Sequence, residues 1–423
     1  EITTRLVGSE MCIRDRYTFL EKISFTRPSG TKEEFMCANM IADEISALKG
    51  VAIIKPFEVS STNFKEVSLL SNDGKVYEVS GYRGSMETDM QGISAPFYYM
   101  ESDSKISQYH AKDKIVLING YLRKKMYKAL TKAKALGFIT YAGDVYDEKA
   151  DIDIRELREP FFEDGKLPGV HMRTFDAMNL VKDNPEKLTL KLLKEEFTTV
   201  SHNVISEIKG LLYPDEVIVY TAHYDSVLFS KGSYDNGAGS VILLELYKYF
   251  LTHRPTRTLR FVWCGSEERG LLGSKNYVYN LSKEELAKIK LNINVDVAGA
   301  VLGKDSAVVL AKESLIHMVN NLAKELAFPI DVSQDIYSSD CIPFADRGVP
   351  AINFMRFGVG NSAHIHDRYD TMYFISADAL DKTYQFVKEF SLRLQNYKVF
   401  PIEKEIPENI VKRVDEYLSL IHI

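Results

Sequence analysis

The chain has 423 residues, of which 45% are hydrophobic and 26% are charged, and its formal net charge is −6. Its length favours two or three domains with a large buried core. The acidic balance excludes the basic field that is typical of nucleic-acid-binding proteins. No segment approaches the roughly 18 consecutive apolar residues of a membrane-spanning helix, and four cysteines are too few for a disulfide scaffold. We therefore expect a globular protein whose partners include neither nucleic acid nor a membrane it would span.

Both ends of the chain look like translated adapter sequence. Residues 6–16 read LVGSEMCIRDR, and residues 418–423 read LSLIHI. Codons for MCIRDR can be the reverse complement of codons for LSLIHI over most of their length, which unrelated protein termini have no reason to show. We therefore set aside residues 1–16 and 418–423 as adapter-like artefacts, with Cys12 and His422. We expect the native N-terminus to be missing, so the sequence does not decide whether a signal peptide precedes it.

A helical region is expected first, interrupted by a turn at residues 27–31. Thr31 and Glu34 have the spacing of a capping box, in which each side chain accepts a hydrogen bond from the other residue's backbone amide. Apolar residues then recur at helical spacing as far as Ile45, and residues 51–59 read as a strand.

The pattern of predicted secondary structure then changes twice along the chain. Short strands with turn signals fill residues 66–195, and strand–helix units repeat from about Ser201 onward. Repeated units of this kind are typical of an α/β sheet with helices on its faces. We expect one discontinuous α/β domain, formed by residues 17–65 and 196–417, with a β-rich insert at 66–195.

Four buried-type strands in the second half each lead to polar side chains that can bind metals or move protons. These are His223 and Asp225 after the first strand, Glu267 and Glu268 after the second, Asp296 after the third, and His364, His366 and Asp370 in the loop after the fourth. Asp235 lies between the first two strands, in a turn ahead of an apolar helix. In open α/β sheets ligands bind beyond the carboxyl ends of the strands, so we expect these residues to converge.

The predicted crevice holds two or three imidazoles and about five carboxylates, but no lysine or arginine. Carboxylates at this density repel one another unless cations bind among them. A mixed histidine and carboxylate set suits Zn²⁺, with Mn²⁺ or Co²⁺ as possible substitutes. One zinc ion uses about three protein ligands, so the surplus predicts two ions that share a carboxylate.

Five motifs in order resemble the co-catalytic zinc aminopeptidases of metallopeptidase family 28. They are HYD at 223–225, YDNGAGS at 234–240, SEERGLLGS at 266–274, NVD at 294–296 and HDRYDT at 366–371. The resemblance covers about 17–65 and 200–395, and the segment 66–195 resembles the protease-associated domain that interrupts many members. It implies the zinc-exopeptidase fold, with a central mixed, largely parallel sheet flanked by helices.

The resemblance also implies a role for each site residue. His223 and Asp296 would hold one zinc ion, Glu268 and His366 the other, and Asp235 would bridge them, with a cis peptide bond to Asn236. Glu267 and Asp225 would be the catalytic residues: Glu267 as the base that takes a proton from the metal-bridging water, and Asp225 as the carboxylate that orients His223. Asp370 would orient His366 in the same way, and His364 would be a loop or substrate-side residue.

The expected function is removal of N-terminal residues from peptides by a di-zinc exopeptidase. A carboxypeptidase or dipeptidase of the same fold is an alternative, for which Arg356 and Arg368 could supply a basic pocket. A glutaminyl cyclase with a single zinc ion is a further alternative. A catalytically inactive, receptor-like binding protein is the last, but it predicts missing ligands, whereas every expected ligand is present.

Substrate preference and oligomeric state stay open, and the insert is expected to form a wall or lid over the cleft. Cys37, Cys264 and Cys341 form no CxxC pair and favour a reducing cytoplasm. Relatives with the insert are often exported, so the location also stays open.

Overall fold

The computed structural model describes residues 16–119, 122–360 and 362–421. Cys12, His422 and most of the predicted N-terminal adapter segment lie outside these residues. Arg16, the last residue of that segment, is buried and donates a hydrogen bond to Asp381.

The chain forms two compact units. Unit 1 comprises Glu1–Val59 and Thr199–Glu416, and unit 2 comprises Ser60–Thr198 with Tyr417–Ile423. The chain passes from one unit to the other inside two long strands, β1 (Ala52–Ser71) and β9 (Lys187–Ile208). The expected domain boundaries, 65/66 and 195/196, therefore fall within continuous strands, where the composition gives no signal for a break.

Unit 1 is built on a mixed sheet with the strand order β14-β13-β15-β12-β10-β11-β9. Besides β9, these strands are β10 (Tyr213–His223), β11 (Arg257–Cys264), β12 (Ile289–Val295), β13 (Gly303–Leu310), β14 (Asp331–Gln334) and β15 (Ala351–Gly358). Four of the six neighbouring pairs are parallel, while β13 runs antiparallel to β15 and β11 antiparallel to β9. The expected mixed, largely parallel sheet is confirmed.

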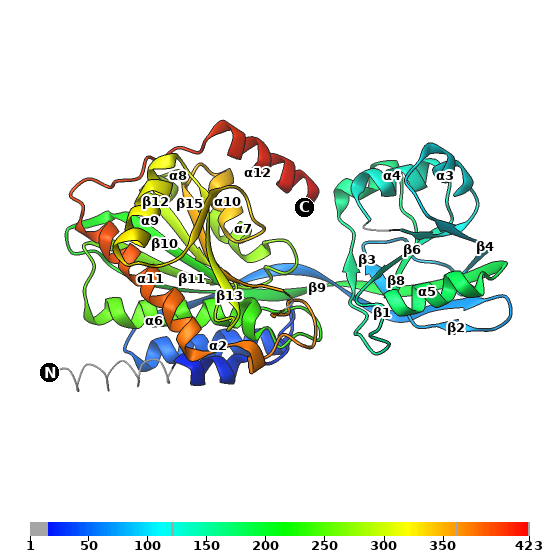
Figure 1. The fold of residues 1–423 in the computed structure, drawn as a ribbon, viewed down its shortest axis with the longest axis horizontal. Helices are drawn as coiled ribbons and strands as arrows, with labels where there is room; N and C mark the ends of the chain where they lie inside the picture. Colours follow the sequence, from blue (N-terminus) through cyan, green and yellow to red (C-terminus); the bar gives the residue numbers. More distant parts are fainter. Residues whose placement is uncertain (1–15, 120–121, 361, 422–423) are drawn as a thin grey trace. The chain divides into compact units, whose positions relative to one another are not determined.

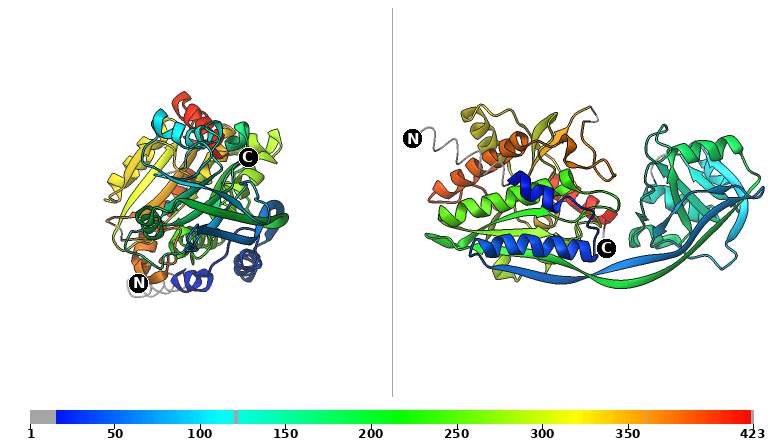
Figure 2. Two further views of the ribbon diagram at one scale, coloured as in Figure 1. Left: turned by 90° about the vertical axis from the view of Figure 1, so that its right-hand side faces the viewer. Right: turned by 90° about the horizontal axis from the view of Figure 1, so that it is seen from below.

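Helices cover both faces of this sheet (Figures 1 and 2). On one face lie α2 (Lys32–Ala47), α6 (Ala238–Thr252) and α11 (Ala377–Asn396); on the other lie α7 (Leu272–Tyr279), α8 (Lys283–Lys288) and α10 (Cys341–Asp346). Along β11, Phe261 packs edge-on against Tyr247 of α6, whereas Val262 and Cys264 belong to a buried cluster with Phe344 of α10. Burial on both faces explains why these strands read as continuous apolar runs.

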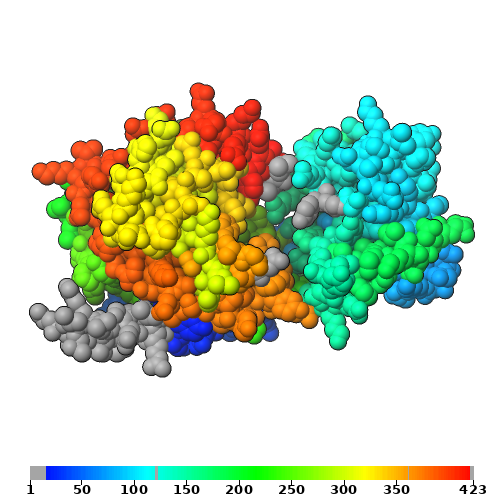
Figure 3. Space-filling view, in the orientation of Figure 1, coloured from blue at the N-terminus to red at the C-terminus, as the bar shows by residue number. Residues whose placement is uncertain are grey.

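Two further helices contribute to unit 1: α9 (Glu313–Glu325), and α12 (Glu408–Ile421) as far as Glu416. The segment that leads into α12 crosses the surface beside residues drawn in yellow in Figure 3. There Lys404 donates hydrogen bonds to the carbonyl oxygens of Leu286 and Ala287 at the end of α8. Ile410 and Val414 are buried, so α12 packs on unit 1 by an apolar face.

Unit 2 has its own sheet, in which the end of β1 and the start of β9 join shorter strands. These strands are β2 (Val76–Tyr77), β3 (Ser80–Arg83), β4 (Ile93–Met100), β5 (Ile115–Ile118), β6 (Gly137–Ala142), β7 (Arg155–Glu156) and β8 (Gly169–Arg173), and the helices are α3 (Lys105–His110), α4 (Lys124–Lys132) and α5 (Thr174–Asp183). Along β5, Ile115 and Leu117 enter one buried cluster, and Val116 and Ile118 enter another. Unit 2 therefore has a core on each face of its sheet.

Across both units, no helix in the described part of the chain has the length and hydropathy that a membrane span requires.

Candidate metal centre

The strands that lead to the predicted site residues are neighbours in the sheet. Their order is β15-β12-β10-β11, and each neighbouring pair is parallel. The carboxyl ends of all four strands therefore meet at one edge. His223 is the last residue of β10, Asp296 follows β12 directly, and Glu267 lies three residues beyond β11.

Two groups of metal-binding side chains lie at this edge and share one residue. Nε2 of His223 lies 3.0 Å from Oδ1 of Asp235 and 3.5 Å from Oδ1 of Asp296. Nε2 of His366 lies 3.2 Å from Oδ2 of Asp235 and 3.1 Å from Oε2 of Glu268. Within each group, the three ligand atoms lie within 4.8 Å of one another. Asp235 thus offers one oxygen to each group, as a bridging carboxylate must.

Glu267 and Glu268 are adjacent in sequence, but their side chains have different neighbours. Glu268 belongs to the group with His366, whereas Oε2 of Glu267 lies 4.0 Å from Nε2 of His223 and belongs to neither group. Asp225 is fully buried between them and the first imidazole. Its carboxylate accepts hydrogen bonds from the backbone amides of Glu267 (3.0 Å) and Glu268 (3.3 Å), and Oδ1 lies 3.5 Å from Nδ1 of His223. Asp225 therefore contacts the imidazole and also holds the turn that carries both glutamates.

Asp235 lies in the turn Ser233–Gly237 that precedes α6, and its peptide bond to Asn236 is cis. Asp370 holds this turn. Its carboxylate accepts hydrogen bonds from the backbone amides of Tyr234 (2.8 Å) and Asp235 (3.2 Å) and from Oγ of Ser230 (3.3 Å). We expected Asp370 to orient His366; these contacts instead direct it to the backbone of the shared aspartate. Spacing along the HDRYDT motif gives no information about such a contact, because Asp235 is 135 residues away in the sequence.

The pKa values of the histidines and the buried carboxyl groups show that the site favours positive charge. Burial raises the pKa of Glu267 well above its ordinary value, and burial also raises the pKa of Asp296. The charge of Glu268 raises the pKa of His366 to about 12. Burial lowers the pKa of His223, yet the surrounding carboxylates outweigh it, and the net effect is a pKa well above the ordinary value. The carboxylates therefore stabilise any cation placed among them.

The donor set fits divalent zinc. Each group combines one imidazole with two carboxylates, which is the mixed nitrogen and oxygen ligation that zinc accepts. Oε1 of Glu268 is buried and accepts no hydrogen bond within the described residues. A buried carboxylate oxygen without a donor is costly unless a cation neutralises it. We therefore regard this edge as a candidate two-metal centre.

His364 lies outside both groups. Its Nδ1 lies 3.0 Å from Oδ2 of Asp367, so it pairs within its own loop. Arg356 is buried, its guanidinium pairs with Asp305, and it donates to the carbonyl oxygen of Ala300. The positive charge of Arg356 is thus paired with the carboxylate of Asp305 inside the fold.

Two carboxylates near the centre were not anticipated from the sequence. Asp340 is fully buried, and its charge adds to the raised pKa of Glu267, after burial and Glu268. Glu34, from α2, hydrogen-bonds to the turn that carries Glu267. Glu34 lies on α2, and Asp340 comes six residues after β14, a strand that the sequence did not single out, so the strand-end signal did not find them. Glu34 was noticed only as part of a helix cap.

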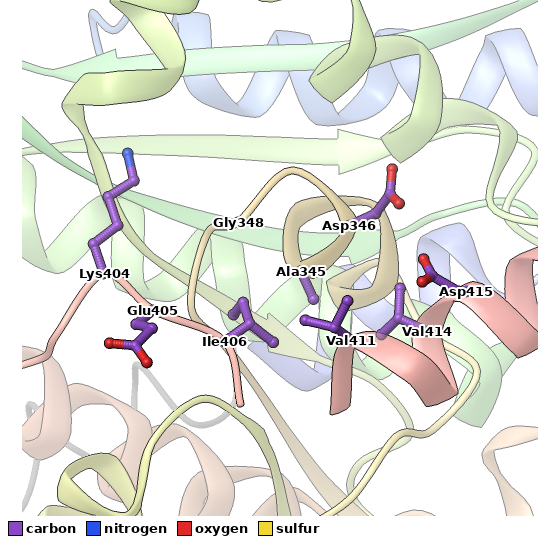
Figure 4. Close-up of a pocket in the computed structure, with 9 residues that line it drawn as sticks. All are labelled: Ala345, Asp346, Gly348, Lys404, Glu405, Ile406, Val411, Val414 and Asp415. Carbon is purple, nitrogen blue, oxygen red and sulfur yellow. The ribbon is translucent and has the colours of Figure 1, made fainter. Parts of the chain in front are cut away.

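A separate hollow of 270 Å³ lies between α10 and the segment that leads into α12. Figure 4 shows Ala345, Ile406, Val411 and Val414 gathered there, with the carboxylates of Asp346 and Asp415 beside them. None of its lining residues belongs to the metal groups.

Comparison with known proteins agrees with this geometry. Residues 203–391 match the model of peptidase family M28. The chain is 30% identical over 340 residues to the aminopeptidase YwaD of Bacillus subtilis, a match that covers 78% of this chain and 72% of that protein. The chain belongs to peptidase family M28. The predicted family and enzyme class are thereby confirmed.

Solved structures show the same architecture. The structure of BSAP, described as a zinc aminopeptidase from Bacillus subtilis, superimposes with a TM-score of 0.77 at 26% identity and covers 93% of this chain and 98% of its own. A peptidase M28 precursor from Shewanella amazonensis gives a TM-score of 0.75 at 22% identity over 96% of this chain and all of that one. The similarity therefore spans both units of this M28 peptidase.

Proposed function

We propose that this M28 peptidase is a zinc-dependent aminopeptidase with two metal ions. The observation that carries the proposal is the pair of ligand groups that share Asp235. His223 and Asp296 would hold one zinc ion, and Glu268 and His366 the other. The relatives named as aminopeptidases, and the related structure described as a zinc aminopeptidase, support both the metal and the reaction class.

When bound, zinc supplies Lewis acidity, which lowers the pKa of coordinated water and polarises the scissile carbonyl group. Glu267 then acts as the general base. Its carboxylate lies beside both groups without belonging to either, so it is free to accept the proton of the attacking water. The same carboxyl group returns that proton to the leaving amine as the peptide bond breaks.

The remaining residues keep this arrangement fixed. Asp225 holds the amides of Glu267 and Glu268, and Asp370 holds the amide of Asp235. Arg356, which a carboxypeptidase could use to bind a C-terminal carboxylate, is already paired with Asp305. This pairing supports aminopeptidase over carboxypeptidase activity.

The test combines zinc analysis with peptide hydrolysis. We expect about two zinc ions per chain, hydrolysis of aminoacyl-p-nitroanilides, and loss of this activity when a chelator removes the metal. An N-acetylated substrate should not be cleaved. Glu267→Gln should retain zinc and lose about 10²- to 10⁴-fold in kcat, the usual contribution of general acid–base catalysis.

A p-nitroanilide has no free carboxylate, so its hydrolysis cannot come from a carboxypeptidase. Two zinc ions with cleavage only of peptides that carry a free C-terminus would replace the proposal with the carboxypeptidase alternative. A folded, zinc-supplied protein that binds no metal would contradict the two-metal centre.

A further inference from the structure

Two buried carboxylates hold three consecutive backbone amides in the turn after β11. Oε1 of Glu34 accepts a hydrogen bond from the amide of Ser266 at 3.0 Å. Asp225 accepts those of the next two residues, Glu267 and Glu268. The carbonyl oxygens of the turn are also bound, since Leu272 donates to Ser266 (3.2 Å) and Gly270 and Leu271 both donate to Glu267 (2.7 Å). The backbone that carries the two glutamates is therefore fixed on both sides.

Glu34 reaches this turn from a distant part of the chain. It is fully buried, and both of its oxygens accept hydrogen bonds. Oε1 also accepts from Oγ of Ser201 (2.6 Å), and Oε2 accepts from the amide of Gly30 (2.6 Å). Only half of the expected capping box forms: Thr31 Oγ1 accepts from the amide of Glu34 (3.2 Å), but the Glu34 carboxylate goes to Gly30 and the β11 turn. Oε1 is thus directed to the site, while Oε2 remains at the helix end with Gly30.

The turn needs this partner because of its backbone conformation. Ser266 has φ 54°, in the left-handed region that residues other than glycine rarely adopt. Its amide points into the protein, where no water replaces a lost acceptor. Without Glu34, the turn would have to move to satisfy that amide, and Glu267 and Glu268 would move with it.

We propose that Glu34 is a positioning residue that, through the backbone of Ser266, sets the directions of Glu267 and Glu268. This inference rests on the proposed function, in which Glu267 is the base and Glu268 a zinc ligand. Among the described contacts, Glu34 touches the amide and the hydroxyl of Ser266 and not the ligand atoms, so it acts on the two glutamates through this turn.

Glutamine cannot replace Glu34, although it has the same shape. In either protonation state a carboxyl group has lone pairs on both oxygens, whereas an amide has them on one atom only. The Glu34→Gln variant would therefore leave the amide of either Ser266 or Gly30 facing another N–H group. Loss of groups that orient metal ligands typically costs about 10- to 100-fold in activity or metal affinity. We expect kcat of Glu34→Gln to fall by this factor with KM changed less than about threefold, and the zinc affinity to fall about tenfold.

Two controls separate positioning from general destabilisation. Ser201→Ala removes a hydroxyl donor from the same oxygen but leaves both backbone amides bound, so kcat should stay within about twofold of the unsubstituted value. Glu216→Gln disturbs the pair with buried Arg257 (2.7 Å) at the opposite end of β10. That site lies seven residues from His223, or about 23 Å along the strand. It should lower the melting temperature and leave kcat unchanged.

The measurements are kcat and KM on an aminoacyl-p-nitroanilide, zinc affinity by competition with a chelating dye, and melting temperature, all on the full chain. If Glu34→Gln does not fold, Glu34→Asp decides by the same measurements, because its shorter carboxylate cannot reach both amides. The inference would be overturned if Glu34→Gln leaves kcat and zinc affinity unchanged. It would also be overturned if Glu34→Gln and Glu216→Gln have equal melting temperatures and lose kcat to the same extent. Two unfolded variants would make Glu34 purely structural and overturn it as well. If the unsubstituted protein shows no hydrolysis, the proposed function fails, and the zinc affinities still decide the role of Glu34.

Discussion

Asp370 offers the sharpest test of how the metal centre is assembled. Asp370→Asn keeps the size of the side chain but leaves only one acceptor atom. In the native protein, both carboxylate oxygens accept a backbone amide, from Tyr234 at 2.8 Å and from Asp235 at 3.2 Å. The asparagine NH₂ group must therefore face one of these two amides.

The size of the effect follows from that unsatisfied contact. A buried amide without an acceptor costs about 1–3 kcal/mol of folding free energy. In a domain of this size, 1 kcal/mol lowers the melting temperature by roughly 2–4 °C. We expect Asp370→Asn to melt about 2–12 °C lower than the unsubstituted protein. Because the turn carries Asp235, zinc affinity should fall about 10- to 100-fold.

The assay is a zinc titration in competition with a chelating dye, which would resolve the two binding steps of the proposed two-metal centre. Asp235 lies in both ligand groups. Displacement of its backbone should therefore weaken both steps. If Asp370 instead oriented His366, as the sequence resemblance implies, only the step that uses His366 would weaken.

Two results would refute this reasoning. Weakening of a single binding step would assign Asp370 to His366. Two steps within about twofold of the unsubstituted protein would mean that the turn does not depend on Asp370.

Two further predictions concern buried residues outside the two ligand groups. The guanidinium of buried Arg27 donates to five backbone carbonyl groups, those of Ile23, Phe25, Tyr224, Lys231 and Gly232. Lysine has three donors, so Arg27→Lys should leave at least two carbonyl groups without a hydrogen bond. We expect the free energy of unfolding to fall by about 2–6 kcal/mol and the melting temperature by about 5 °C or more. An unchanged melting temperature would contradict this. In unit 2, burial lowers the pKa of His171 to about 3, from an ordinary value of 6.5. Between pH 6.5 and about pH 3 the imidazole is protonated in the unfolded chain but not in the folded one. The free energy of unfolding should therefore fall by about 1.4 kcal/mol per pH unit as the pH drops through that range. In urea unfolding measured across this range, His171→Gln should show a smaller fall per pH unit, and equal slopes in the two proteins would argue against the prediction.

The sequence by itself determined the fold class, the family and which side chains meet at the sheet edge. Strands buried on both faces leave continuous apolar runs, and the residue at the end of each run is visible in the sequence. His223 and Asp296 are found in this way, since they end or directly follow β10 and β12. The order of the HYD, SEERGLLGS and HDRYDT motifs then predicts the family.

Only the tertiary structure decided which residues hold those side chains in place. Glu34 looked like a helix cap and instead binds the amide of Ser266, 232 residues away. Asp370 was expected beside His366, its near neighbour in sequence, but accepts from the backbone of Asp235. Such contacts depend on where α2 and the loop after β15 pack against the sheet. A pattern of spacing carries no information about which distant backbone amide a buried carboxylate will satisfy, because any amide left without water by the fold can be its partner.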